Sequence, residues 1–206
     1  MENIDQDQVM TDGLPLEGED VVSEDQPSRL QKFLIEVLET VVLALIMFGL
    51  INFSTARIRV DGPSMEPTFL HNNYVIVSKM SYRLGAIDRG EVMVFHFPRN
   101  PEEDYIKRVI ALEGDTVRIR NGNVIVNGEK LDEPYIKDIT RRDHSQITVE
   151  PGNVYVMGDN RNNSSDSRSW GNLPVENVLG KAILIYWPFT DFGVVEHLHL
   201  ALLKAK

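Results

Sequence analysis

The 206-residue sequence contains no cysteine, and this absence excludes several kinds of protein at once. Without thiols the chain has no disulfide framework, no cysteine nucleophile and no thiolate metal site. It also shows no internal repeat, no glycine-rich phosphate loop and no basic patch of the kind that nucleic-acid binding requires. We therefore expect no metal, no cofactor and no nucleic-acid partner.

Basic residues are absent from positions 1–28, which hold nine of the 31 acidic residues. The net charge of −10 is therefore concentrated there, and the remainder, with 21 basic and 22 acidic residues, is close to neutral. Residues 1–28 are also poor in aromatics and interrupted by glycine and proline. Such a segment cannot bury enough apolar surface to offset chain entropy, so we expect a disordered acidic tail.

Charged residues are then nearly absent from Val37–Phe53, whose polar members are Glu39, Thr40 and Asn52. At ~1.5 Å per residue this run spans roughly 25 Å, and residues 33–36 extend it toward the ~30 Å hydrocarbon core of a bilayer. The pattern predicts one transmembrane helix over residues 29–54. A cleaved secretory signal fits less well, because the run starts deep in the chain and follows an acidic segment.

A buried core helix is the other rival for this run, but a helix that is apolar all round needs a far larger protein around it. Orientation in the membrane does not follow from charge. Arg29 and Lys32 flank one end, and Arg57 and Arg59 flank the other, so the count of basic residues is tied.

After the apolar run the chain consists of short apolar or alternating segments separated by turns every 8–12 residues. This spacing predicts an antiparallel β domain rather than alternating βαβ units. Asn121-Gly122 between two such segments indicates a hairpin, since Asn-Gly favours the type I′ turn. The predicted strands are Tyr74–Ser78, Glu91–Phe97, Val117–Arg120, Val124–Val126, Gln146–Val149, Val154–Met157 and Ala182–Tyr186.

The turn Asp61–Phe69 presents the first candidate catalytic residue, Ser64. Two prolines and a glycine in nine residues exclude a helix interior or a central strand, which leaves a rigid, exposed turn. A serine held in this way is a candidate nucleophile if a base lies within hydrogen-bond reach. Serines in such turns also commonly bond only to nearby backbone, so both interpretations are open at this point.

The base could be a histidine or a lysine. None of His71, His96, His144, His197 and His199 stands in a distinctive context, and a His–Asp triad remains possible. Lys107 lies among apolar and β-branched residues, in what should be a strand facing the core. Burial lowers the pKa of a lysine from its usual ~10.4. A buried lysine is therefore either a functional base or one half of a structural ion pair.

A third polar cluster occupies Gly158–Arg168, directly after a predicted strand. It combines two carboxylates, two guanidiniums and several serine and asparagine side chains. Such a cluster fits a hydrogen-bonded network that supports a site, with Arg–Asp pairs fixing its geometry. A polar loop stabilised by local turns is the alternative.

Together, in this order, these stretches resemble the type I signal peptidases, bacterial membrane-bound serine proteases. Similarity extends over about residues 57–189 and leaves the acidic tail outside. The residues that carry it are Gly62–Thr68, Arg89–Phe95, Tyr105–Asp115, Gly158–Arg168 and Trp170-Gly171.

The resemblance implies a dyad with Ser64 as nucleophile and Lys107 as general base. It also implies a single-pass protein of the plasma (inner) membrane, in contact with membrane lipid, with tail 1–28 in the cytoplasm. The catalytic domain, residues 55–206, would lie outside the cytoplasm. Its substrates would be secretory preproteins, whose signal peptides are cut after a small-x-small motif.

Roles for other residues follow from the same resemblance. Ser164 would bond to the lysine nitrogen and orient it, while Asp166 with Arg168, and Asp159 with Arg161, would brace the loop. Some family members carry a hydroxyl residue at the position of Gly62, so here the oxyanion hole would rest on backbone N–H groups of Ser64 and the Gly62 turn. The substrate would lie as an added strand. The residues expected around it and around the lysine are Ile58, Val60, Met65, Val75, Val94, Asp104, Tyr105 and Ile106.

Two other classes of function share part of this pattern. Self-cleaving repressors of the bacterial damage response have the same serine–lysine β fold, but they carry an N-terminal helix-turn-helix where this chain has an acidic tail and an apolar span. A membrane-tethered β module that binds peptides without cutting them would keep the fold and lose the dyad.

Overall fold

The computed structural model describes residues 28–197 and 202–203. The segment expected to be a disordered tail therefore lies outside the described residues except for Ser28, and so does His199. The described residues fall into two units, one ending at Ala44 and the other beginning at Leu45.

Helix α1 covers Arg29–Ser54 and has no buried residue. Its start is a capping box: the Gln31 N–H donates to Ser28 Oγ at 3.2 Å, and the Ser28 N–H donates to Gln31 Oε1 at 2.7 Å. At its end, Ser54 Oγ donates back to the Leu50 carbonyl at 2.7 Å. By length and composition alone, with a mean hydropathy of 2.4, this helix could cross a membrane.

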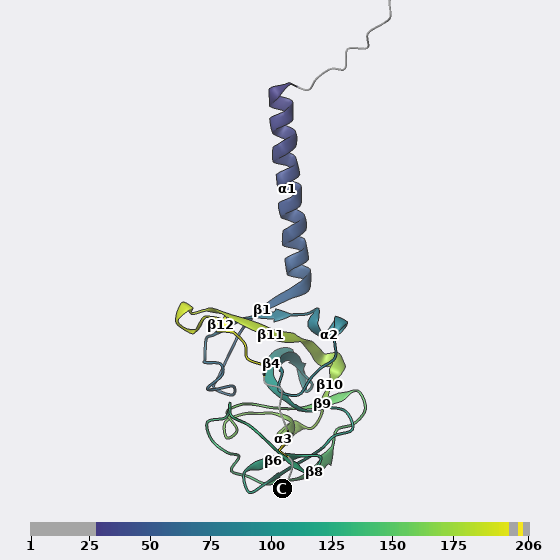
Figure 1. The fold of residues 1–206 in the computed structure, drawn as a ribbon, viewed down its shortest axis with the longest axis vertical. Helices are drawn as coiled ribbons and strands as arrows, with labels where there is room; N and C mark the ends of the chain where they lie inside the picture. The colour runs from purple at the N-terminus through teal and green to yellow at the C-terminus, as the bar shows by residue number, and fades with distance from the viewer. Residues whose placement is uncertain (1–27, 198–201, 204–206) are drawn as a thin grey trace, which may run out of the picture. The chain divides into compact units, whose positions relative to one another are not determined.

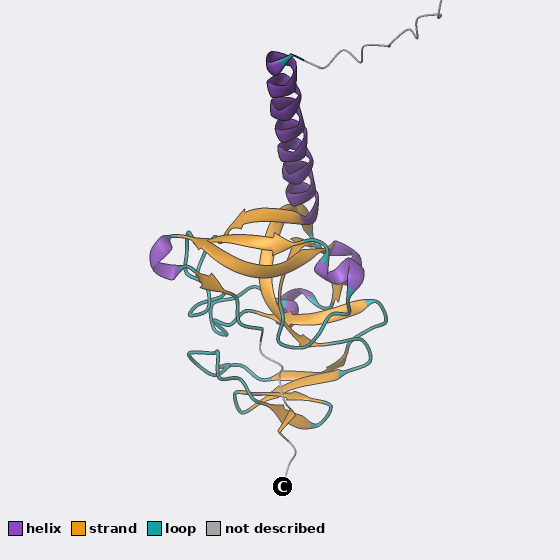
Figure 2. Ribbon diagram, turned by 45° about the horizontal axis from the view of Figure 1, so that its top comes forward, coloured by secondary structure: helices purple, strands orange, loops and turns teal. Residues whose placement is uncertain are grey.

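The larger of two sheets contains eight strands, all antiparallel to their neighbours (Figures 1 and 2). It is not a closed barrel, because its two end strands, β1 and β10, do not pair within the described residues. The order is β1 (Thr55–Arg59), β2 (Tyr74–Ser78), β11 (Val178–Trp187), β3 (Val92–Phe97), β4 (Asn100–Ala111), β9 (Asn153–Met157) and β10 (Leu173–Pro174), with β12 (Gly193–Val194) beside β11.

A second, five-stranded antiparallel sheet lies at the other end of the same unit, where Figure 1 labels β6 and β8. The predicted Asn-Gly hairpin joins two of its strands: Arg120 pairs with Asn123, and Asn121 and Gly122 both have positive φ, at 50° and 79°. Its order is β13 (Leu202–Leu203), β7 (Glu129–Leu131), β6 (Asn123–Val126), β5 (Thr116–Arg120) and β8 (His144–Thr148).

Short helical segments complete the described structure: α2 (Ser81–Leu84), α3 (Ser167–Trp170), η1 (Val175–Asn177) and η2 (Phe189–Asp191). The predicted fold class, mainly antiparallel β preceded by one apolar helix, is confirmed. Two strands differ from the prediction. Strand β4 runs for 12 residues, and the five-residue β1, which was not predicted, follows α1 without a loop.

Candidate active site

The turn that carries Ser64 is fixed at both of its ends. Val60 and Asn73 join its two arms, with the Val60 N–H donating to the Asn73 carbonyl at 2.8 Å. Met65 and Phe69 are completely buried and belong to a core cluster that also contains side chains from β2 and β3. The turn is therefore anchored by apolar packing on one side and leaves Ser64 half-buried on the other.

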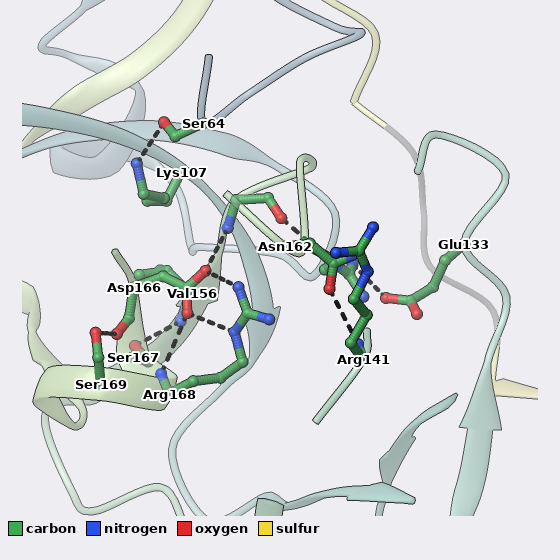
Figure 3. Close-up of polar contacts among 12 residues, drawn as sticks. Ser64, Lys107, Glu133, Arg141, Val156, Asn162, Asp166, Ser167, Arg168 and Ser169 are labelled. Atoms are coloured by element: carbon green, nitrogen blue, oxygen red, sulfur yellow. Dashed lines mark hydrogen bonds and ion pairs between the residues drawn. The ribbon is translucent and has the colours of Figure 1, made fainter. Parts of the chain in front are cut away.

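Lys107 lies on β4 opposite Met93 of β3 and is only 3% exposed. Its Nζ atom is 2.9 Å from Ser64 Oγ and 2.8 Å from the carbonyl oxygen of Ile106 (Figure 3). No carboxylate within residues 28–197 forms an ion pair with it. The structural ion pair that the sequence left open is therefore not formed there.

Burial lowers the pKa of Lys107 to about 8, an effect that the more distant carboxylates of Asp166 and Asp159 partly offset and the Arg168 guanidinium reinforces. The Nζ atom also lies 5.2 Å from the centre of the Tyr105 ring. Near pH 8, a lysine with this pKa is about half in the amine form. That form has a lone pair to accept the Ser64 proton, which the ammonium lacks.

No histidine within the described residues hydrogen-bonds to Ser64. His71 faces Asp61 at 3.3 Å, and His96 bonds to Asp104 at 2.8 Å, so both histidines have carboxylate neighbours of their own. Both pairs lie at the surface. Within the described residues, neither His–Asp pair is therefore hydrogen-bonded to a serine, as a catalytic triad would require.

Arg108, the residue after the lysine, ties the strand to the polar loop and was not anticipated from the sequence. Its Nε and Nη2 atoms donate to the two carboxylate oxygens of Asp159 at 2.9 and 2.7 Å, and both side chains are buried. Thr68 Oγ1, from the serine turn, donates to the same carboxylate at 2.5 Å. Asp159 thus joins the turn, the lysine strand and the loop.

The expected pairing of Asp159 with Arg161 is therefore wrong. Arg161 instead donates from Nη2 to Glu133 at 2.5 Å and from Nε to the Gly158 carbonyl at 3.2 Å. The pairing of Asp166 with Arg168 is present, with hydrogen bonds of 2.7 and 2.6 Å (Figure 3).

The expected hydrogen bond between Ser164 and the lysine is absent. Ser164 Oγ is buried and has no partner within the described residues. Gly158 explains how this serine comes so close to the dyad: a Cβ atom on Gly158 would lie 2.3 Å from Ser164 Oγ and 2.4 Å from the Ser64 carbonyl oxygen. Only glycine fits between the two serines.

The two backbone N–H groups expected to form the oxyanion hole, those of Gly62 and Ser64, differ in whether they already have a hydrogen-bond partner. The Gly62 N–H donates to Nδ1 of the exposed His71 at 3.1 Å, so it is occupied in this structure. The Ser64 N–H has no hydrogen-bond partner within the described residues. A free backbone N–H beside the Ser64 hydroxyl is able to donate to an anionic oxygen bound there.

A groove of about 440 Å³ runs beside the dyad, between Ile58–Gly62 and Glu103–Lys107. Within the described residues both walls are strand edges without a partner, because β1 pairs only with β2, and β4 pairs with β9 only from Arg108 onward. An extended peptide could therefore bond to both edges as an added strand.

Five of the expected substrate residues line this groove, together with four residues that were not expected there. The expected ones are Ile58, Val60, Asp104, Tyr105 and Ile106, and the unexpected ones are Arg59, Asp61, Glu103 and Ser165. Met65, Val75 and Val94 do not line it, because they are completely buried in the core cluster that Val60 and Ile106 join. They support the groove from within the core and have no surface for a substrate to contact.

Comparison with known proteins gives consistent matches. The family described as signal peptidase, peptidase S26, matches residues 34–187. A probable signal peptidase I-2 of Synechocystis sp. is 38% identical over 78% of this chain and 77% of its own. The signal peptidase I of Leptolyngbya laminosa is 36% identical over 78% of this chain and 83% of its own. The signal peptidase I of Bacillus caldolyticus is 40% identical over 65% of this chain and 80% of its own. A solved signal peptidase I from Enterococcus faecalis V583 aligns with 46% of this chain and 95% of its own at 30% identity, with a TM-score of 0.43.

Proposed function

Because this chain belongs to the signal peptidase family, peptidase S26, we propose that it is a membrane-bound serine endopeptidase that removes signal peptides from secretory preproteins. Cleavage would follow a small-x-small motif. The observation that carries the catalytic assignment is the 2.9 Å contact between Ser64 Oγ and the buried Nζ of Lys107. Burial favours the neutral amine, which is the form that a general base requires.

In the proposed reaction, Lys107 accepts the Ser64 proton as the hydroxyl oxygen attacks the scissile carbonyl carbon. The negative charge that develops on the carbonyl oxygen is stabilised by the free Ser64 N–H. The Lys107 ammonium then returns the proton to the leaving amine, which leaves the signal peptide esterified to Ser64. Lys107 next takes a proton from water, and the resulting hydroxide attacks the ester carbonyl carbon. When the ester C–O bond breaks, the signal peptide leaves as the free acid and Lys107 returns the proton to Ser64 Oγ.

Ser164 is proposed to orient the lysine, although it does not bond to it in this structure. A neutral Lys107 amine that accepts from Ser64 has two N–H groups, and the Ile106 carbonyl takes one of them at 2.8 Å. Ser164 Oγ is buried, unpaired and close to Ser64. If the Ser164 or the Lys107 side chain rotated so that Ser164 Oγ met the remaining N–H of Lys107, both groups would have a hydrogen-bond partner.

The substrate is proposed to lie in the groove with its main chain bonded to β1 and β4. The walls contributed by Ile58, Val60 and Ile106 are apolar and belong to or pack on the core. Their position leaves shallow pockets, which suit the small side chains at the −1 and −3 positions of a signal peptide.

The membrane arrangement is part of the same proposal. Helix α1 would be the single transmembrane span of residues 29–54, with tail 1–28 cytoplasmic and residues 55–206 outside the plasma membrane. This orientation places the catalytic residues on the side where signal peptides emerge during secretion.

Cleavage of a purified preprotein by the full chain in detergent tests the proposal. Mass spectrometry of the products should find one cut after a small-x-small motif, and Ser64→Ala should remove it. A chain that cuts itself but never the preprotein would favour the repressor-like function. A chain that binds signal peptide without cutting it would favour the non-catalytic module.

A further inference from the structure

A second cavity, of about 470 Å³, is lined by nine residues, four of which are arginines. Arg141 and Arg142 come from the segment before β8, His144 begins β8, and Arg161 and Arg168 come from the polar loop and α3. No acidic side chain of the described residues lines it, and it shares no lining residue with the substrate groove. The cavity is therefore a separate, basic site.

Buried hydrogen-bonding groups in the wall of this cavity lack partners. Thr140 is 3% exposed and Arg161 is 2% exposed, yet Thr140 Oγ1 and Arg161 Nη1 bond to nothing within the described residues. Ser164 Oγ, unpaired as noted above, belongs to the same wall. Buried polar groups are normally satisfied, and Ser164 is already assigned to Lys107, so the two unpaired groups of Thr140 and Arg161 in the wall of one cavity point to a missing ligand.

The positive charge of the cavity is only partly balanced. Arg161 pairs with Glu133 and Arg168 with Asp166. Arg141 and Arg142 form no ion pair within residues 28–197. An anion would therefore meet two guanidiniums without counter-ions, in addition to the free Nη1 of Arg161.

Hydrogen bonds hold the wall of the cavity together. The side-chain amide of Asn162 donates to the Ile139 carbonyl at 3.0 Å and accepts from the Arg141 N–H at 3.0 Å (Figure 3). This bridge joins the segment before β8 to the polar loop, which supplies the other residues of the wall. The backbone that carries Arg141 is thus fixed against the polar loop, while the side chains of Arg141 and Arg142 are exposed.

We propose that this cavity binds a phosphate-type oxyanion, held by Thr140 Oγ1, Arg161 Nη1 and the guanidiniums of Arg141 and Arg142. A carboxylate has about four acceptor positions, whereas these groups offer more donors than that, and phosphate matches the fork geometry of arginine. The cavity is many times larger than the ~30 Å³ that one water occupies, so it also has room for the ester group of a phospholipid head. Ser164 connects this site to the neighbourhood of Ser64, but binding does not depend on whether Ser64 cleaves.

The test measures phosphate binding to the full chain in uncharged detergent, by calorimetry and by thermal shift at constant ionic strength. Arg141→Gln combined with Arg142→Gln should raise the Kd for phosphate at least about tenfold, the effect of losing one hydrogen bond to a charged group. The matched control is Arg99→Gln combined with Lys130→Gln, which removes two exposed charges elsewhere, and it should leave the Kd unchanged. Thr140→Val should also weaken binding.

A second experiment distinguishes the phosphate of a lipid head group from free inorganic phosphate as the ligand. The full chain in phosphatidylcholine nanodiscs, with or without phosphatidylglycerol, is heated in buffers free of phosphate. A thermal shift with the anionic lipid that the Arg141/Arg142 variant loses and the control keeps assigns the site to a lipid head group. Binding of inorganic phosphate alone assigns it to the free ion. Equal weakening in both double variants, or no response to phosphate or to anionic lipid, overturns the proposal.

Discussion

Two adjacent residues of β4 place cations on opposite sides of the same strand, and their surroundings differ completely. Lys107 and Arg108 are 3% and 1% exposed. Arg108 has a bidentate partner in Asp159, a further bond to the Gly90 carbonyl at 2.8 Å, and the Tyr135 ring 4.3 Å away. Within the described residues, Lys107 hydrogen-bonds only to a hydroxyl and a carbonyl, with the Tyr105 ring 5.2 Å away and no carboxylate in contact.

This difference shows how one strand makes one cation structural and its neighbour reactive. A buried charge with a well-formed partner stays charged and becomes costly to disturb. A buried amine without a partner loses its proton more easily, because burial disfavours the ammonium. Alternation along a β-strand sends the two side chains to opposite faces, so the same backbone segment fixes both.

The largest expected effect comes from removing the members of the dyad. Ser64→Ala, Lys107→Ala and Lys107→Arg should each lower preprotein cleavage by roughly a millionfold, the loss typical when one member of a catalytic unit is deleted. Lys107→Arg should be as inactive as Lys107→Ala because a guanidinium does not deprotonate. Cleavage rates of purified full-length variants check this, with unfolding curves as the control for folding. Retained activity in any of the three would contradict the assignment.

The next largest effect should be on the free energy of unfolding, which removal of Arg108 and removal of Lys107 should change differently. Arg108→Met leaves the Asp159 carboxylate buried without its partner and should cost about 3–5 kcal/mol. Lys107→Met removes a buried ammonium that has no counter-ion, so it should leave stability unchanged or increase it. Denaturant unfolding of both variants in the same detergent compares them directly. Adding Asp159→Asn to Arg108→Met should restore part of the loss, and equal losses in the two single variants would contradict the contrast.

The sequence predicted the nucleophile turn, the lysine strand and the Asn-Gly hairpin, because each depends on local chemistry. It did not predict the partner of Asp159. Arg161 is two residues away, but strand register brings Arg108, 51 residues away in sequence, to the carboxylate. Similarly, Val75 and Val94 are apolar residues of the strands near the groove, and only the packing of the sheet shows that they face the core. Pairings that span the fold depend on register and packing, which local patterns do not encode.

Two substitutions in the polar loop, Ser164→Ala and Asp166→Ala, should differ in whether they lower only the rate of cleavage or also the stability of the protein. Ser164→Ala removes a hydroxyl that has no partner in this structure, so stability should change little, while kcat should fall roughly tenfold to a thousandfold if the hydroxyl orients Lys107 during reaction. Asp166→Ala leaves Arg168 without its partner and the Gly158 N–H without its acceptor, so it should cost a few kcal/mol as well. Kinetics and unfolding of both variants give the comparison. Full activity of Ser164→Ala, or equal destabilisation by the two, would show that the roles are not divided in this way.

The pH dependence should be the mildest effect, and in kcat/KM it should follow the titration of Lys107. With a pKa lowered to about 8, mainly by burial, kcat/KM should fall tenfold per unit below pH 8 and level off above it.

Stability should change in the same direction. Between pH 8 and the ordinary value of 10.5, the unfolded lysine holds its proton and the folded one does not, so unfolding takes up a proton and stability rises with pH across that window. The difference in unfolding free energy between the native chain and Lys107→Met isolates this one group and should change by roughly 3 kcal/mol across the window. Arg108→Met, compared in the same way, should show no such slope, since its guanidinium stays charged throughout. A rate that is flat from pH 6 upward, or a constant difference between the native chain and Lys107→Met, would mean that Lys107 does not titrate in this range and is not the base.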